Sequence, residues 1–330
     1  MKYLLKQMIK KIFYNDFFLS FFILPAAFII DLYYKIGRNN LPKTTNKLKQ
    51  NGLYRIFDYL VKDHFDQKLV NRNFSNSKKK NCIIFLLHGK DILTIFENAL
   101  ISLKNSKVSI DKIAYCQKES EFLFQNVCNK YEVKLISAGN NFSKSKEQYF
   151  KHGSNIFNNI TKYKWSLILE TFSYGYDNVI YSDIDIVFFR DFVPYINEVS
   201  KKYKCGIQSE ALPSYPLNCC TGFMYFNKSA KKLLKKLFEV NNKYLFQGND
   251  QDAFNYVYRN SSKISKEFYV FPDSLFQSGL LYKTHLNKNF LSLVEELKPY
   301  FFHANFVFGI NNKIKLLKFL SLWFLNKKNN

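Results

Sequence analysis

The sequence contains no paired-cysteine motif and no cysteine–histidine spacing of the kind that binds zinc. None of its six cysteines forms a Cys-X-X-Cys pair: Cys82, Cys116, Cys128, Cys205, Cys219 and Cys220. Cys82 and Cys116 lie in apolar runs typical of strands, where cysteine behaves as a small buried hydrophobic residue. The cysteines therefore argue against a structural zinc module and favour reduced thiols in a compartment that faces the cytosol.

Acidic residues are few relative to basic ones. The excess of basic residues is not accompanied by a nucleic-acid-binding motif. The formal charge is +23, from 49 Lys and Arg against 26 Asp and Glu. The lysines are scattered in small groups, such as those at 78–80 and 231–232, and form neither a basic tail nor a known recognition signature. The charge indicates a solvated basic surface or attraction to an anionic membrane surface, and we expect no nucleic acid partner.

The apolar run near the N-terminus is short for a membrane span. Residues 17–30 (FFLSFFILPAAFII) are bounded by Asp16 and Asp31 and interrupted by Pro25, whereas a span needs roughly 20 apolar residues. A signal-anchor, a monotopic or re-entrant helix and a buried core helix all fit, and the lysines that precede the run favour a peripheral or re-entrant mode. No small-residue site follows, which argues against a cleaved signal peptide.

These features divide the chain near residue 80. Residues 1–80 are expected to form an apolar helix and a connector associated with a membrane. The cytoplasmic face is favoured, and a type II orientation in the Golgi lumen is the alternative. The segment at 71–81 is rich in Ser, Asn and Lys and is typical of a linker. Residues 81–330 are expected to form the main domain.

From residue 82 onward, apolar runs typical of strands alternate with segments of helical spacing. Strands are predicted at 82–87, 111–116, 133–137 and 178–181, and helices at 92–103, 119–130 and 156–174. This order predicts an α/β fold with a mixed, mostly parallel sheet flanked by helices. Ligands of such sheets bind beyond the carboxyl ends of the strands, which is where the loop at 88–91 lies.

The second half of the chain is predicted to mix both element types and contains no internal repeat. Strands are expected at 204–207, 222–227 and 268–271, and helices at 229–241, 250–258 and 313–325.

Two aspartates follow the strand-like run at 178–181. Asp183 and Asp185 stand between NVIY and the apolar run IVFF. In an extended segment, residues two apart point to the same side. Two carboxylates at a strand end suit Mg²⁺ or Mn²⁺ bound together with a diphosphate. A solvated turn is the alternative, but the apolar flanks make unpartnered charges costly there, and we predict a metal site.

Four segments occur in the order and spacing of the motifs of one enzyme family. They are YGYDNVIYSDIDIVFFRDF (174–192), NCCTGFMYFNKS (218–229), NDQDAFNYV (249–257) and PYFFHANFVFGINNKIKLL (299–317). They resemble the DxD region, the TGF strand, the DQ motif and the closing His–Gly–Lys segment of the nucleotide-diphospho-sugar transferases. These are GT-A fold glycosyltransferases related to the glycogenin-like and lipopolysaccharide galactosyltransferase families. The resemblance covers roughly residues 82–325.

The resemblance implies a GT-A catalytic domain at 81–330 and a metal-dependent transfer reaction. The donor would be a nucleotide sugar, with a UDP-sugar expected, and the acceptor a hydroxyl group of a glycan or glycolipid. The related families imply retention of anomeric configuration.

The resemblance also implies which residues bind the metal and the diphosphate. Asp183, Asp185 and His303 would hold Mn²⁺ or Mg²⁺, with His303 as a neutral imidazole ligand. Without the resemblance, a histidine among aromatic residues is more often a hydrogen-bonded core residue. Gly309 and Lys313 would lie along the diphosphate, Lys313 as a point charge.

The donor sugar is implied to face Asp250 and Gln251, which would be the catalytic residues. Asp250 has an alternative role, together with Asp252, as a cap of the predicted helix. Three further residues are implied to contact the nucleotide sugar: His88, Gly89 and Lys164.

The sequence departs from the family pattern at Cys220, where many relatives have an asparagine, and this leaves one sugar contact open. A sugar nucleotidyltransferase is a rival within the same class, but such enzymes have a glycine-rich basic loop, and residues 82–91 contain only Gly89. A degenerate sugar- or membrane-binding module is a second rival, against which the intact metal-binding residues argue.

Overall fold

A computed structural model describes residues 79–138, 160–209, 219–243, 249–261, 264, 266–272, 275–279 and 298–325. All of them fall within one unit of the chain, Phe74–Ala211 with Pro216–Asn330. The predicted membrane-associated segment at 17–30 lies outside the described residues and stays a prediction. Among the helices that are described, none is long and apolar enough to cross a membrane.

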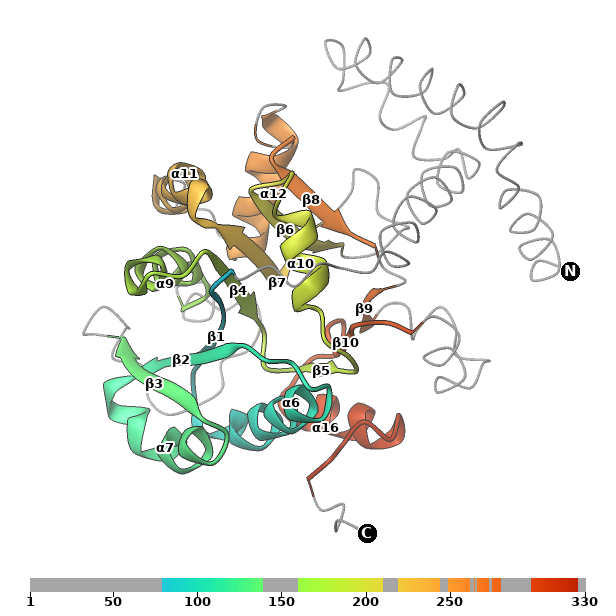
Figure 1. The fold of residues 1–330 in the computed structure, drawn as a ribbon. Coiled ribbons are helices and arrows are strands. Elements are labelled where there is room, and N and C mark those ends of the chain that lie inside the picture. The colour runs from blue at the N-terminus through green and yellow to red at the C-terminus, as the bar shows by residue number, and fades with distance from the viewer. Residues whose placement is uncertain are drawn as a thin grey trace, which may run out of the picture. The chain divides into compact units, whose positions relative to one another are not determined.

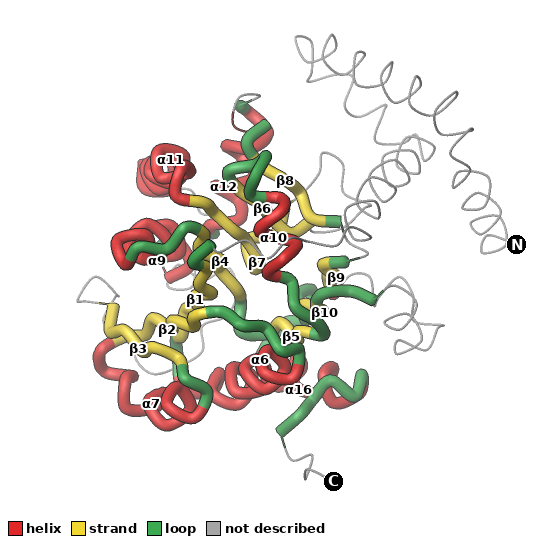
Figure 2. The backbone as a smooth tube through the Cα atoms, in the orientation of Figure 1, coloured by secondary structure: helices red, strands yellow, loops and turns green. Residues whose placement is uncertain are grey.

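The central sheet has seven strands in the order β3-β2-β1-β4-β7-β6-β8 (Figures 1 and 2). Its strands are β1 (Asn81–Leu87), β2 (Asp111–Gln117), β3 (Val133–Ala138), β4 (Asn178–Ser182), β6 (Cys205–Ser209), β7 (Cys219–Asn227) and β8 (Phe268–Phe271). Of these described strands, only β7 runs antiparallel to its neighbours. The sheet is therefore mixed and mostly parallel, which confirms the predicted α/β class.

The parallel strands β1 and β4 are buried on both faces. Every residue of β4 is buried, as are five of the seven residues of β1. Strands covered by helices on both sides carry continuous apolar runs instead of alternating ones. For this reason CIIFLL and NVIY could be identified from the sequence.

The helices cover both faces of the sheet (Figure 1). They are α6 (Leu93–Asn105), α7 (Glu121–Lys130), α9 (Lys164–Thr171), α10 (Val193–Val199), α11 (Lys231–Lys243), α12 (Asp250–Asn260) and α16 (Ile310–Phe319). Helices α9, α11 and α12 build one core, in which Trp165 lies 6.3 Å from the ring of Phe226 and 6.2 Å from that of Phe254. On the opposite face, α6 packs through Phe96, whose ring centre lies 5.4 Å from that of Phe85.

Single helical turns join several of these elements. They are η3 (Lys90–Ile92), η4 (Lys118–Ser120), η5 (Phe172–Tyr174) and η6 (Lys228–Ala230).

A second, three-stranded sheet adjoins the first and brings distant segments together (Figure 2). Its order is β5 (Ile186–Phe188), β10 (Phe301–His303) and β9 (Phe276–Ser278). Strand β10 runs antiparallel to β5 and places His303 opposite Ile186. The backbone N–H of Ala304 donates to the carbonyl of Asp185 at 3.0 Å. This pairing sets His303 beside the acidic turn.

The predicted helix at 313–325 is wrong at both ends. Helix α16 begins at Ile310, directly after Gly309, whose φ is 82°. It ends at Phe319, because Ser321 adopts φ 59° and the N–H of Leu322 donates to the carbonyl of Leu317 at 2.8 Å. A left-handed residue followed by this hydrogen bond is a Schellman stop.

The long helix predicted at 156–174 is also interrupted. Residues 156–159 lie outside the described residues, and the described helical segment breaks at Tyr163 before α9 begins at Lys164. The break places Lys164 in the first turn of α9, beside the end of β4.

Candidate functional site

A cleft of about 430 Å³ opens at the carboxyl ends of β1 and β4. The chain places β2 on one side of β1 and β4 on the other, so the strand order reverses here, as at the ligand sites of other open α/β sheets. Eight of the ten residues singled out from the sequence line it: His88, Lys164, Asp183, Asp185, Asp250, Gln251, His303 and Lys313. Gly89 and Gly309 do not line the cleft but adjoin residues that do. The structure thus gathers segments from five parts of the chain.

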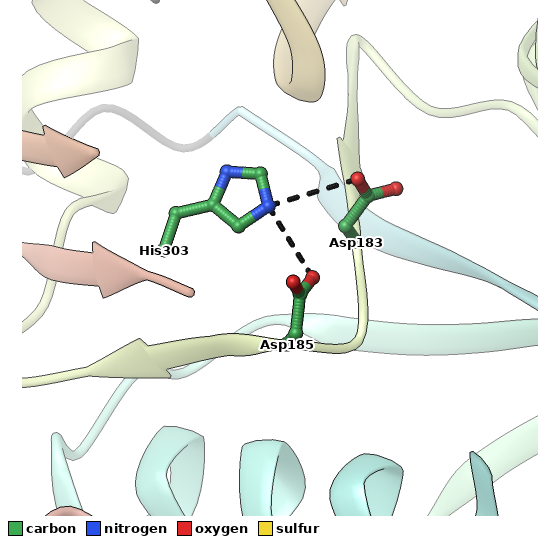
Figure 3. A group of neighbouring side chains, drawn as sticks. All are labelled: Asp183, Asp185 and His303. Carbon is green, nitrogen blue, oxygen red and sulfur yellow. Dashed lines mark ion pairs between the residues drawn. The ribbon is translucent and has the colours of Figure 1, made fainter. Parts of the chain in front are cut away.

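Asp183 and Asp185 lie in the turn that connects β4 to β5, where the chain passes from one sheet to the other. The expectation of an extended segment is therefore wrong. The turn nevertheless aims both carboxylates at His303 (Figure 3). Nε2 of His303 lies 3.3 Å from Oδ1 of Asp185 and 3.7 Å from Oδ2 of Asp183. The three ligand atoms lie within 4.8 Å of one another, and two carboxylates with one imidazole suit a divalent cation such as Mn²⁺.

Asp185 is the most strongly held of the three groups. Its side chain is buried, and Oδ2 lies 2.5 Å from Nζ of Lys313. Burial by itself would raise the pKa of Asp185, but the charges of Lys313 and His303 hold it well below its usual range. Burial would likewise lower the pKa of His303, yet Asp185 raises it to about 10. The two shifts have one cause, the attraction between the Asp185 carboxylate and a protonated His303 ring.

Lys164 connects Asp183 to Asp250 of helix α12. Its Nζ lies 3.1 Å from Oδ2 of Asp250, 3.4 Å from Oδ1 of Asp183 and 4.6 Å from the ring centre of Tyr181. Lys164 is 5% exposed and Asp250 2%. Burial opposes the charge of Lys164, but Asp183 and Asp250 raise its pKa well above the usual value. The lysine is therefore a buried cation shared by two carboxylates.

The capping hypothesis for Asp250 is wrong, because Asp252 caps α12 together with Asn249. The N–H of Asp252 donates to Oδ1 of Asn249, and the N–H of Asn249 donates to Oδ2 of Asp252, both at 3.0 Å. This reciprocal capping box fixes the first turn of α12. The side chain of Asp250 turns to Lys164, and Gln251 lines the cleft beside it.

Two glycines shape the loops at the rim. Gly89 (φ 82°) follows His88 at the end of β1, and Gly309 (φ 82°) precedes α16. Both backbones lie in a region that favours glycine. Burial lowers the pKa of His88 to about 4, although a hydrogen bond with the side chain of Gln117 opposes the change, so His88 is neutral at pH 7.

Several residues at the site were not assigned roles from the sequence. The hydroxyl of Tyr181 donates to Oδ1 of Asp183 at 2.9 Å. Sγ of Cys220 lies 3.9 Å from Nδ1 of His303, and the amide of Asn305 donates to this sulfur at 3.6 Å. Tyr181 and Asn305 lie within the quoted motifs, each close in sequence to a residue of the cluster, Asp183 and His303 respectively. This closeness is the sequence feature from which a role at the site could have been predicted.

Gly222 leaves no room for a side chain. A Cβ at this position would lie 2.3 Å from Cε1 of His303 and 2.7 Å from Oδ2 of Asp183. We expect Gly222→Ala to weaken Mn²⁺ binding by about 10- to 100-fold, the loss seen when metal ligands are displaced from their supported positions. Titration of Mn²⁺ by calorimetry measures this directly.

Gly175 provides the control for Gly222. It has φ 85° and open space where a Cβ would go. Gly175→Ala is expected to lower stability by about 1 kcal/mol through backbone strain and to leave the Mn²⁺ affinity unchanged. Equal Mn²⁺ affinities for the wild type and Gly222→Ala would contradict the proximity of Gly222 to the ligands.

Comparison with known proteins finds relatives that are similar to this chain in sequence. Two curated proteins of Arabidopsis thaliana align with it. UDP-D-xylose:L-fucose alpha-1,3-D-xylosyltransferase 3 is 27% identical over 202 residues, which is 53% of this chain and 50% of that protein. UDP-D-xylose:L-fucose alpha-1,3-D-xylosyltransferase MGP4 is 28% identical over 195 residues, 53% of this chain and 52% of that protein. The chain thus spans about half the length of the curated relatives it matches.

A solved structure and a family also match. Apo mouse xyloside xylosyltransferase 1 aligns with a TM-score of 0.46 and 14% identity, over 70% of this chain and 99% of that one. Residues 123–317 match the family described as nucleotide-diphospho-sugar transferase. This segment is more than half of the 330 residues and includes the acidic turn, the DQ segment and His303. The chain therefore belongs to the nucleotide-diphospho-sugar transferase family.

Proposed function

We propose that this protein is a glycosyltransferase that moves a sugar from a nucleoside diphosphate, in the form of a UDP-sugar, to a hydroxyl group of a glycan or glycolipid. The observation that carries the proposal is the cluster of Asp183, Asp185 and His303 in the cleft, with Lys164 and Lys313 beside it. Family membership supports the reaction class, and the names of the plant relatives, which specify UDP-D-xylose, support a UDP-sugar donor.

The charges of the cluster suit a divalent cation and a diphosphate together. Three carboxylates (Asp183, Asp185 and Asp250) face two lysine ammonium groups, so one negative charge remains when His303 is neutral. A divalent cation would reverse this sign and make the cleft attractive to a diphosphate. When bound, Mn²⁺ or Mg²⁺ would neutralise charge on the leaving nucleoside diphosphate. Asp183, Asp185 and His303 would hold it.

Lys313 would contact the diphosphate. Its ammonium group pairs with Asp185, the carboxylate that would also bind the cation. We propose that Lys313 then turns to the diphosphate, next to the open backbone at Gly309. Its position in the first turn of α16 keeps it at the rim of the cleft.

The far side of the cleft would receive the sugar and the base. Lys164 fixes Asp250, and Gln251 follows it in a helical turn held by the capping box. We propose that Asp250 and Gln251 face the donor sugar and that Gln251 stabilises the oxocarbenium-like centre in a reaction that retains configuration. His88, which is neutral, would lie near the uracil and ribose with Gly89.

Mn²⁺ binding is expected to release about one proton at pH 7. The pKa of His303 in the metal-free protein is raised to about 10, so the ring carries a proton that must leave before Nε2 can bind a metal. Low pH favours the protonated, metal-free form, and the Mn²⁺ affinity should fall as pH falls, by up to about tenfold per unit.

Calorimetry at pH 7 in buffers of different ionisation heat counts the released protons. His303→Gln should release none from this position. A binding heat of the wild type that does not depend on the buffer would argue against His303 as a ligand.

The proposed function is tested by incubating the full chain with a panel of nucleotide sugars and Mn²⁺. Transfer to an added acceptor, or slow hydrolysis of one UDP-sugar that stops on chelation of the metal, is expected. Synthesis of a sugar nucleotide from a sugar phosphate would instead identify a nucleotidyltransferase. Binding of nucleotide sugar without any turnover would identify a binding module.

A further inference from the structure

Among the described residues, Gln208 makes the shortest hydrogen bond to Nδ1 of His303. It lies in β6 and is fully buried. Its Oε1 lies 2.8 Å from Nδ1 of His303. The register between β6 and β7 jumps at this point, from Ile207 opposite Met224 to Gln208 opposite Cys220. At this irregularity, the side-chain amide of Gln208 lies next to the imidazole of His303.

The orientation of the Gln208 amide is fixed by its other contacts. Its Nε2 donates to the backbone carbonyl of Phe276 at 3.3 Å and to that of Gln277 at 3.2 Å. Carbonyl oxygens only accept hydrogen bonds. The NH₂ group must therefore face β9, which leaves Oε1, an acceptor, facing His303.

An acceptor at Nδ1 determines which ring nitrogen carries the proton. Nδ1 must donate to Oε1 of Gln208, so a neutral His303 has its lone pair on Nε2. Nε2 is the atom that faces Asp183 and Asp185. Metal-binding histidines depend on such an outer partner for both tautomer and ring orientation.

We propose that Gln208 is a positioning residue that holds His303 in the Nδ1–H tautomer and aims its Nε2 at the metal site. This inference rests on the proposed metal-dependent function. Gln208 would touch neither the metal nor the nucleotide sugar and would act only through His303. The backbone of β9 takes part because it orients the amide.

The test compares two buried side-chain amides. Gln208→Met keeps the length of the side chain and removes the acceptor, and we expect the Kd for Mn²⁺ to rise 10- to 100-fold. Asn98→Leu is the matched control: Asn98 is fully buried in α6 and does not line the cleft, and its amide donates to the carbonyl of Leu322 at 3.1 Å and accepts from the N–H of Phe324 at 2.7 Å. This variant should bind Mn²⁺ like the wild type. Thermal unfolding of both variants without metal shows whether a change in affinity reflects a general loss of structure.

The possible results separate the two claims. If the wild type binds Mn²⁺ and Gln208→Met binds it equally well, the positioning role is overturned while the proposed function stands. If the wild type binds no Mn²⁺, the metal site and this inference both fall.

A second measurement needs no substitution at Gln208. In ¹⁵N-histidine-labelled full chain with saturating Mg²⁺, the His303 signals, identified by their absence in His303→Gln, should show a proton on Nδ1 and none on Nε2. A proton on Nε2 instead would overturn the role of Gln208.

Discussion

Asp185→Asn is expected to lower sugar transfer by at least about 10²- to 10³-fold, the scale observed when a group that stabilises transition-state charge is removed. Asparagine has nearly the same shape but no charge. Asp185 is the buried carboxylate that faces both His303 and Lys313. Its replacement removes an anionic metal ligand and leaves Lys313 without its carboxylate partner. The kcat/KM for the donor and the Kd for Mn²⁺ should both deteriorate.

Asp177→Asn is the matched control. Asp177 is a half-exposed carboxylate that pairs with Lys228 at 2.9 Å and does not line the cleft. Exposed ion pairs contribute at most about 1 kcal/mol, so this variant should keep its turnover and Mn²⁺ affinity. Wild-type turnover in Asp185→Asn would contradict the assignment of Asp185 as a metal ligand.

Lys164→Met is expected to lower the free energy of unfolding by about 3–5 kcal/mol, the range for removing one partner of a buried ion pair. Methionine replaces the aliphatic stem but removes the ammonium group. Asp250, 2% exposed, would then be a buried charge that has lost its lysine. Transfer should also be lost, because the same ammonium group holds Asp183 and the first turn of α12 in place. Denaturant unfolding and single-turnover kinetics measure the two effects.

Lys204→Met tests whether the effect depends on burial. Lys204 pairs with Glu267 at 2.9 Å at the surface, where its side chain is 44% exposed. Its replacement should change stability by less than about 1 kcal/mol and leave activity intact. If Lys164→Met and Lys204→Met prove equally mild, the buried bridge between Asp183 and Asp250 is not an important contact.

The parallel half of the fold could be predicted because its strands are buried on both faces. CIIFLL and NVIY are continuous apolar runs, and the segments between them have helical spacing. The smaller sheet could not be predicted in this way. Its strands β5, β9 and β10 have three residues each, too few to show a period. The aromatic side chains of β9 and β10 pack with Phe223 and Phe188, which are distant from them in the sequence.

The cluster of Asp183, Asp185 and His303 could be predicted because motifs mark these residues, although the local geometry differed. Asp183 and Asp185 meet His303 through a turn between two sheets and not along one strand. The contact of Lys164 with Asp250 joins residues that no local sequence pattern relates. The alternative role of Asp250 as a helix cap is filled instead by Asn249 and Asp252. Gln208 belongs to no quoted motif, and its bond to His303 joins β6 of the large sheet to β10 of the small one, a contact that only the structure reveals.

The proposed metal centre of Asp183, Asp185 and His303 would make the cleft a diphosphate site. It is tested by calorimetric titration of UDP into the full chain, with Mn²⁺ and after chelation of all divalent metal. UDP should bind when Mn²⁺ is present, and binding should be lost both on chelation and in Asp185→Asn. UDP binding of equal affinity without metal, or no binding under either condition, would contradict the account.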